Sequence, residues 1–193
     1  MRWTLLVVLL AGCAESKRKP VPAGPPPGGM GPSPMMMGGI DLPEMRKASE
    51  ARLEDDDEVV GIVVGGTARA YSLKAMAPMT SHVVNDLAGG VPVTVTYCDL
   101  AECVRVFTGP GKGKHLGLGQ MGRVEDSLLL NAGGRMIRQS TGRAMGGEGE
   151  PLPTVAHERT TWKAWRTAHP DTLAYDRSPR SAIPGGEPGG ENW

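Results

Sequence analysis

The feature that most constrains the fold is a series of short apolar runs separated by glycine-rich breaks in a chain of 193 residues. Residues 58–64 and 67–73 flank the pair Gly65 and Gly66, and a Gly-Gly pair between β-rich runs predicts a two-residue hairpin turn. Further runs follow at 91–98, 103–108, 115–120, 127–131 and 135–139. This spacing predicts a mainly β (α+β) domain, built as an antiparallel sandwich or a small barrel.

Helices are expected to be a minority. Residues 42–53 and 160–168 are the two candidate segments. In the second segment Trp162 and Trp165 are three residues apart, which places them on one helix face, and Pro170 ends the helix. The sequence therefore predicts one or two short helices beside the strands.

The amino terminus resembles a bacterial lipoprotein signal. Met1 and Arg2 precede an apolar run too short to span a bilayer, and the run ends in the sequence Leu-Ala-Gly-Cys at Cys13. This pattern predicts a cleaved signal peptide over residues 1–12 and acylation of Cys13, so that the chain contacts a membrane through its N-terminal acyl chains. The alternative is an N-terminal core helix that ends in cysteine. Ala14 after the acylated cysteine indicates the outer membrane of the cell envelope, with the domain facing the periplasm or the cell surface.

The composition divides the remaining chain into three parts. We expect a Pro/Gly/Met-rich tether over 13–44, a single globular domain over 45–183 and a disordered tail over 184–193. The tether contains the thioethers of Met35 to Met37, which are soft donors suited to Cu(I), but low-complexity sequence is the favoured explanation. The balance of 21 basic and 21 acidic residues argues against nucleic acid as a partner. No protein partner is indicated by the sequence.

The two remaining cysteines are the strongest candidates for chemistry. If residues 99–102 form a loop between strands, Cys98 faces Cys103, at a separation that a disulfide can bridge. In an exported chain we therefore expect a Cys98–Cys103 disulfide. Strand alternation assigns one set of side chains to the core face (Val93, Val95, Tyr97, Val104 and Val106) and the other set to the opposite face (Thr94, Thr96, Cys98, Cys103, Arg105 and Phe107). The cysteine pair is then either a structural staple or a catalytic redox site at which Arg105 stabilises a thiolate.

His82 is the candidate metal ligand. A neutral imidazole near Cys98 or Cys103 could bind copper, zinc or iron, so the cofactor is unknown, with a transition metal as the hypothesis. The alternative is a loop histidine bonded to backbone, with Asn85 and Asp86 forming the turn before Gly89. The chain contains none of the motifs typical of serine hydrolases, P-loop enzymes or zinc peptidases.

Four segments carry a recognisable pattern: ARAYS at 68–72, HVVND at 82–86, GGVPVTVTYCDLA at 89–101 and TTWKAWRTAHPDT at 160–172. In order and spacing they resemble an uncharacterised bacterial family, the domain of unknown function 3179. The family pattern has Cys-Pro-Leu-Cys where this chain has Cys98, Asp99, Leu100 and Ala101, so the second cysteine of the pattern is replaced and Cys103 comes two positions later. The resemblance hints at redox use of the cysteine region, and it names no reaction.

Two hypotheses of function follow. In the first, the chain is an exported lipid-anchored protein with thiol-redox or metal-binding activity at Cys98, Cys103, Arg105 and His82. In the second, it is a non-enzymatic binding or scaffolding module of the cell envelope with a structural disulfide. The sequence leaves open whether the protein is an enzyme.

Overall fold

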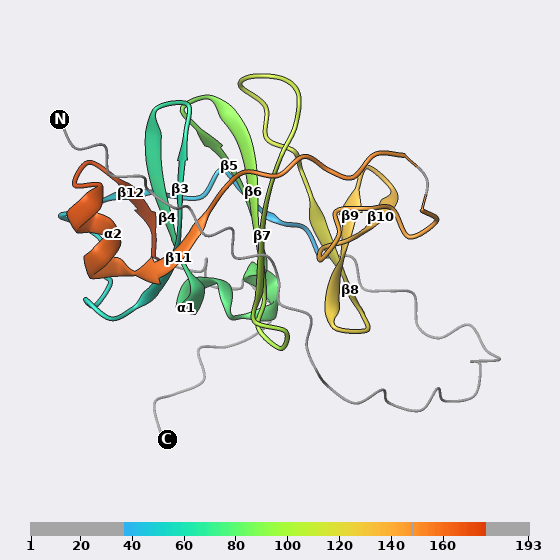
Figure 1. Cartoon of the computed structure of the whole chain (residues 1–193), viewed down its shortest axis with the longest axis horizontal. Coiled ribbons are helices and arrows are strands. Elements are labelled where there is room, and N and C mark those ends of the chain that lie inside the picture. The colour runs from blue at the N-terminus through green and yellow to red at the C-terminus, as the bar shows by residue number, and fades with distance from the viewer. Residues whose placement is uncertain (1–36, 148, 177–193) are drawn as a thin grey trace, which may run out of the picture.

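The computed structural model describes residues 37–147 and 149–176. The expected signal peptide, the acylated Cys13, most of the tether and the tail lie outside these residues. Strands form three sheets in the described part of the chain, accompanied by two short α-helices and one 3-10 turn (Figure 1). The predicted mainly β class with few helices is confirmed, and the sheets pack as open layers rather than as a closed barrel.

A four-stranded sheet forms the middle of the molecule, in the order β1-β5-β6-β7. Strands β5, β6 and β7 form an antiparallel meander, and β1 runs parallel to β5. The sequence predicted the bounds of β6 and β7 correctly. The strands of this sheet are β1 (Ile40–Asp41), β5 (Val83–Ala88), β6 (Val91–Cys98) and β7 (Cys103–Thr108).

A five-stranded sheet, in the order β11-β3-β4-β12-β2, covers one face of the middle sheet. The predicted hairpin at its centre is confirmed, because β3 and β4 are joined by Gly65 and Gly66 with φ angles of +58° and +73°. Such angles suit glycine, which has no Cβ to clash with the backbone. The strands are β2 (Arg46–Lys47), β3 (Glu58–Val64), β4 (Thr67–Ser72), β11 (Glu158–Thr161) and β12 (Leu173–Tyr175).

A three-stranded sheet, in the order β10-β9-β8, lies on the other side of the middle sheet (Figure 1). Its antiparallel strands contain a bulge between Gln120 and Gly122. The strands are β8 (Gly119–Val124), β9 (Ser127–Ala132) and β10 (Arg135–Arg138).

Helix α2 (Trp162–Ala168) confirms the predicted C-terminal helix. The hydroxyl of Thr161 accepts a hydrogen bond from the amide of Ala164 and so caps its first turn. Trp162 and Trp165 are both buried, on one face, against the five-stranded sheet. The indole of Trp165 packs directly over Gly61 of β3, where no side chain would fit. A short helix α1 (Leu73–Met76) and a 3-10 turn (Met79–Ser81) follow β4.

Two apolar clusters fill the spaces between the sheets. We call the cluster between the middle and five-stranded sheets the inner cluster, whose buried members include Val60, Ile62, Tyr71, Val84, Val93, Val95, Tyr97, Val104 and Val106. The cluster between the middle and three-stranded sheets is called the cysteine cluster, and it consists of Val83, Cys98, Cys103, Phe107, Leu118, Leu128, Leu130 and Ile137. The middle sheet is therefore buried on both faces.

Several predicted elements are wrong. Residues 42–53 form no helix, because strand β2 pairs with β12 and the amide of Ala48 bonds the carbonyl of Thr172, so tertiary pairing replaces local helical bonds. The predicted strand 115–120 begins only at Gly119. Strands β1, β5, β11 and β12 were not predicted. Among residues 37–147 and 149–176, no helix is long and apolar enough to span a membrane.

Candidate functional site

The cysteine pair lies where β6 and β7 meet their connecting turn. The predicted register is confirmed, since Cys98 is directly opposite Cys103 across the ladder. The disulfide predicted between them is not formed, because Cys98 is a free cysteine in the structure. Cys98 has no exposed surface and Cys103 is 7% exposed.

The surroundings of the two cysteines correct the sequence prediction. Alternation placed them on the face turned away from the core, and that face is itself covered by the three-stranded sheet. The side chains of Leu128, Leu130 and Ile137 belong to the same buried cluster as both sulfur atoms. A thiol packed among aliphatic groups lacks the positive neighbours and solvent access that make cysteine reactive. Cys98 therefore has the environment of a structural cysteine.

Arg105, the predicted thiolate partner, is directed elsewhere. Its Nη2 donates a hydrogen bond of 2.6 Å to the backbone oxygen of Ser140. Gln139, which is fully buried, occupies the space beside the strand and donates through Nε2 to Thr96 Oγ1 and to the carbonyl of Cys103. The polar groups near the cysteines thus hold residues 139–140 against β6 and β7.

His82 uses both ring nitrogens in contacts within the protein. Nδ1 lies 2.9 Å from the backbone oxygen of Met76, and Nε2 lies 3.2 Å from Oδ1 of Asp99. Both ring nitrogens therefore face an acceptor within the protein, so each is already engaged in a contact that holds the fold. The side chain is 4% exposed and joins the end of α1 to the β6–β7 turn.

The structure does not bring His82 to the cysteines. Its ring packs at 71° to the ring of Tyr97, with centroids 6.4 Å apart, and Tyr97 belongs to the inner cluster. Cys98 and Cys103 belong to the cysteine cluster on the opposite face of the sheet. In the described part of the chain, no group of three or more His, Cys, Asp or Glu residues is arranged to hold a metal ion.

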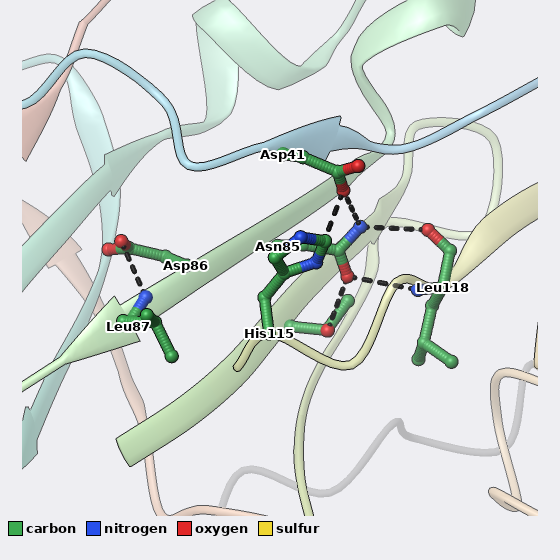
Figure 2. A network of polar contacts seen from close by, with 7 residues as sticks. Asp41, Asn85, Asp86, Leu87, His115 and Leu118 are labelled. Atoms are coloured by element: carbon green, nitrogen blue, oxygen red, sulfur yellow. Dashed lines mark hydrogen bonds and ion pairs between the residues drawn. The ribbon is translucent and has the colours of Figure 1, made fainter. Parts of the chain in front are cut away.

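Asn85 is the centre of a polar network that sequence reasoning missed. It was expected in a turn, and it lies instead within β5, fully buried. Its Nδ2 donates to Asp41 Oδ1 (2.7 Å) and to the Leu118 carbonyl (2.9 Å). Its Oδ1 accepts from Thr94 Oγ1 (2.6 Å) and from the Leu118 amide (3.1 Å). Figure 2 shows this amide between Asp41, which also lies 3.5 Å from His115 Nδ1, and the segment at Leu118.

The Asn85 network is saturated, because all four hydrogen-bonding positions of a neutral amide have a partner. It links β1, β5, β6 and the segment that leads into β8. Asn85 and Thr94 are directly paired across the β5–β6 ladder, a match that the sequence reveals only once 83–88 is recognised as a strand. The arrangement positions strands and leaves no donor or acceptor of the amide for a ligand.

Asp86 forms a second missed centre, on the opposite face of β5. Its Oδ2 accepts a hydrogen bond of 2.8 Å from the Tyr71 hydroxyl and lies 3.5 Å from Arg69 Nε. The Arg69 side chain is 12% exposed, and two of its nitrogens, Nε and Nη1, are buried without a hydrogen-bond partner. Burial, together with the charge of Asp86, raises the pKa of Tyr71 well above its ordinary value. This phenol therefore stays protonated and donates to the carboxylate.

A more exposed ion pair borders the β6–β7 turn. Arg159 of β11 donates to both carboxylate oxygens of Glu58 on β3, at 3.0 and 2.8 Å. Its third contact, 3.4 Å to the carbonyl of Glu102, reaches the turn itself. The hydrogen bond from Arg159 lowers the pKa of Glu58. Burial raises the pKa of the neighbouring Tyr97.

These observations define the class of the protein: a layered β domain whose candidate site residues are built into its interior contacts. The family described as "Protein of unknown function (DUF3179)" matches residues 37–182. The chain belongs to this family, as its four motif segments indicated. No curated protein and no solved structure matches the chain.

Proposed function

We propose that this chain is an exported, lipid-anchored bacterial protein whose β domain acts as a non-enzymatic binding or scaffolding module of the cell envelope. The anchor is supported by the signal-like sequence that ends at Cys13. With cleavage there, acyl chains would tether the domain to the outer membrane, and the Pro-rich residues that follow would hold it clear of the surface.

The observation that carries the non-enzymatic part is the complete burial of Cys98 in an apolar cluster. The contacts of the other candidate residues also support a structural role. His82 contacts a carbonyl and a carboxylate, and Arg105 contacts a backbone oxygen. Groups that are consumed in holding the fold are poor candidates for nucleophile, base or metal ligand.

Thiol-redox activity is the competing function, and one observation favours it: the two cysteines occupy directly opposed positions, and Cys98 carries a free thiol. The two functions differ in whether that thiol can react in the folded protein. A structural thiol reacts only when the domain unfolds, whereas a redox thiol must exchange with external thiols while the domain stays folded.

Alkylation of the purified full chain tests the difference. Iodoacetamide labelling of Cys98, followed by mass spectrometry, is expected to be negligible in buffer and complete in denaturant. A matched measurement in glutathione redox buffers is expected to show no change in the Cys98 redox state. Rapid labelling of Cys98 in the folded protein, or reversible exchange with glutathione, would overturn the proposal in favour of redox activity.

The anchor has a separate test. Cells that express the chain are grown with labelled palmitate, and the label is expected in the wild-type protein and in Cys98→Ala. It should be lost from Cys13→Ser, which should also move from the detergent phase to the aqueous phase on Triton partitioning. A wild-type protein without label would disprove the anchor and leave the interpretation of Cys98 unaffected.

A further inference from the structure

Two methionines lie side by side at the edge of the three-stranded sheet. The amide of Met145 donates a 2.9 Å hydrogen bond to the carbonyl of Met136, and the amide of Arg138 bonds the carbonyl of Arg143 at the same distance. These bonds flank an antiparallel bridge between Ile137 and Ala144. Met136 and Met145 are therefore directly opposed, so their side chains leave the same face from Cα atoms about 5.5 Å apart.

This face is turned to solvent. Ile137, which follows Met136 in β10, is 1% exposed and belongs to the cysteine cluster, so Met136 points the other way. Met136 is 46% exposed and Met145 is 40% exposed. Both line a hollow of about 420 Å³ together with Arg135, Ala144, Gly146 and Gly149. Two thioethers thus share one open hollow.

The donors in this hollow suit a soft metal ion. Thioether sulfur is a soft ligand that selects Cu(I), whereas hard ions such as Mg²⁺ and Ca²⁺ prefer oxygen. The side chains of the described lining residues offer sulfur and no oxygen. The donors therefore favour a soft ion such as Cu(I).

We propose that Met136 and Met145 form a binding site for Cu(I), in which both thioether sulfurs coordinate the ion and the solvent side stays open to a further ligand. The site is separate from the cysteines and from His82, and it does not depend on the function or the anchor proposed above. It would give the domain a metal cargo without a catalytic centre.

Titration of the full chain with Ag(I), an air-stable analogue of Cu(I), tests the site. With methionine methyl groups labelled by carbon-13, the signals of Met136 and Met145 are expected to shift together and to saturate with one ion. The Met136→Leu and Met145→Leu variants should each bind about tenfold or more weakly. The double variant should bind one ion fewer. Anaerobic competition for Cu(I) with a chromophoric chelator should rank the affinities of the wild type and the variants in the same order.

Met79→Leu is the matched control, because Met79 is 62% exposed and lies outside the hollow. This variant is expected to bind as the wild type does. Leucine at exposed positions preserves the fold, and an unchanged thermal unfolding transition checks that it does. The proposal is overturned if the Met136 and Met145 signals do not move, if only the methionines before residue 38 respond, or if the double variant binds as many ions as the wild type.

Discussion

Both faces of the middle sheet are buried, but the buried polar side chains on the two faces are partnered in different ways. The face toward the five-stranded sheet carries aliphatic side chains and one charged group, Asp86, with Arg69 and Tyr71 as partners. The face toward the three-stranded sheet carries the two cysteines and Phe107 with neutral amides and hydroxyls, of which Asn85 has every hydrogen bond satisfied. The charged Arg105 on this face is only part-buried and donates to the Ser140 carbonyl.

The difference shows what each polar group contributes. A neutral amide with four partners costs little to bury and fixes the positions of the strands that it contacts. A buried carboxylate requires a counter-charge, and here the counter-charge is held at 3.5 Å with two of its nitrogens unpartnered. The buried Asp86–Arg69 pair therefore adds less to the stability of the fold than the Asn85 amide does, and losing either member of the pair is more costly.

The largest expected effect comes from breaking the charged face. Asp86→Asn keeps an acceptor for the Tyr71 hydroxyl and leaves the Arg69 guanidinium buried without a counter-charge. The free energy of unfolding, measured by urea denaturation, should fall by about 3–5 kcal/mol. The double variant Arg69→Met with Asp86→Leu should recover most of this loss. A loss below about 1 kcal/mol in the single variant would show that Arg69 is solvated in the folded state.

The neutral face should give the next largest effect. Asn85→Ala leaves the Leu118 amide and carbonyl and the Thr94 hydroxyl without their partner, which should lower the free energy of unfolding by about 3 kcal/mol. Thr94→Val is the control, since it removes one bond and keeps the side-chain shape, and it should cost about 1 kcal/mol. Equal losses in the two variants would contradict the central role assigned to Asn85.

The sequence predicted what local patterns encode. Glycines at a tight turn revealed the β3–β4 hairpin, and alternation in β6 and β7 gave their bounds, their register and the sorting of side chains between faces. The tryptophan spacing and Pro170 predicted α2. Each of these features depends on residues that are close together in the chain.

What the sequence could not provide was the partner of each surface. The side chains of Cys98 and Arg105 were assigned to an outer face because no residue pattern near them in the sequence indicates that strands β8–β10 cover that face. Asn85 and Asp86 resemble a turn, and they form a strand because distant groups at Leu118 and Tyr71 satisfy them. His82 and Cys98 fall in successive motif segments, yet the His82 ring packs on Tyr97 of the inner cluster and Cys98 is buried in the cysteine cluster.

Cys98 tests whether the neutral face tolerates a polar atom without a partner. Cys98→Ala removes one buried sulfur and should lower the free energy of unfolding by about 1–2 kcal/mol. Cys98→Ser preserves the shape and buries a hydroxyl among aliphatic groups, so it should cost more than the alanine variant. Urea denaturation of both variants checks the order. A serine variant as stable as the wild type would show that the thiol lies beside polar groups or water.

The smallest effect should come from an ion pair that is exposed rather than buried, which makes Glu58 the counterpart of Asp86. Arg159 lowers the pKa of Glu58 in the folded state below the ordinary value of 4.5. The unfolded chain therefore takes up the proton first as the pH falls, so the contribution of the pair is complete at neutral pH and is lost through the range below pH 4.5.

Because the Glu58 side chain is 54% exposed, solvent screens the pair, and Glu58→Gln should cost less than about 1 kcal/mol at pH 7. Unfolding curves of wild type and variant should converge at pH 3, with Glu50→Gln as the control because Glu50 is exposed and has no ion pair in the described part of the chain. A difference that persisted at pH 3 would mean that Glu58 stabilises the fold through packing rather than charge.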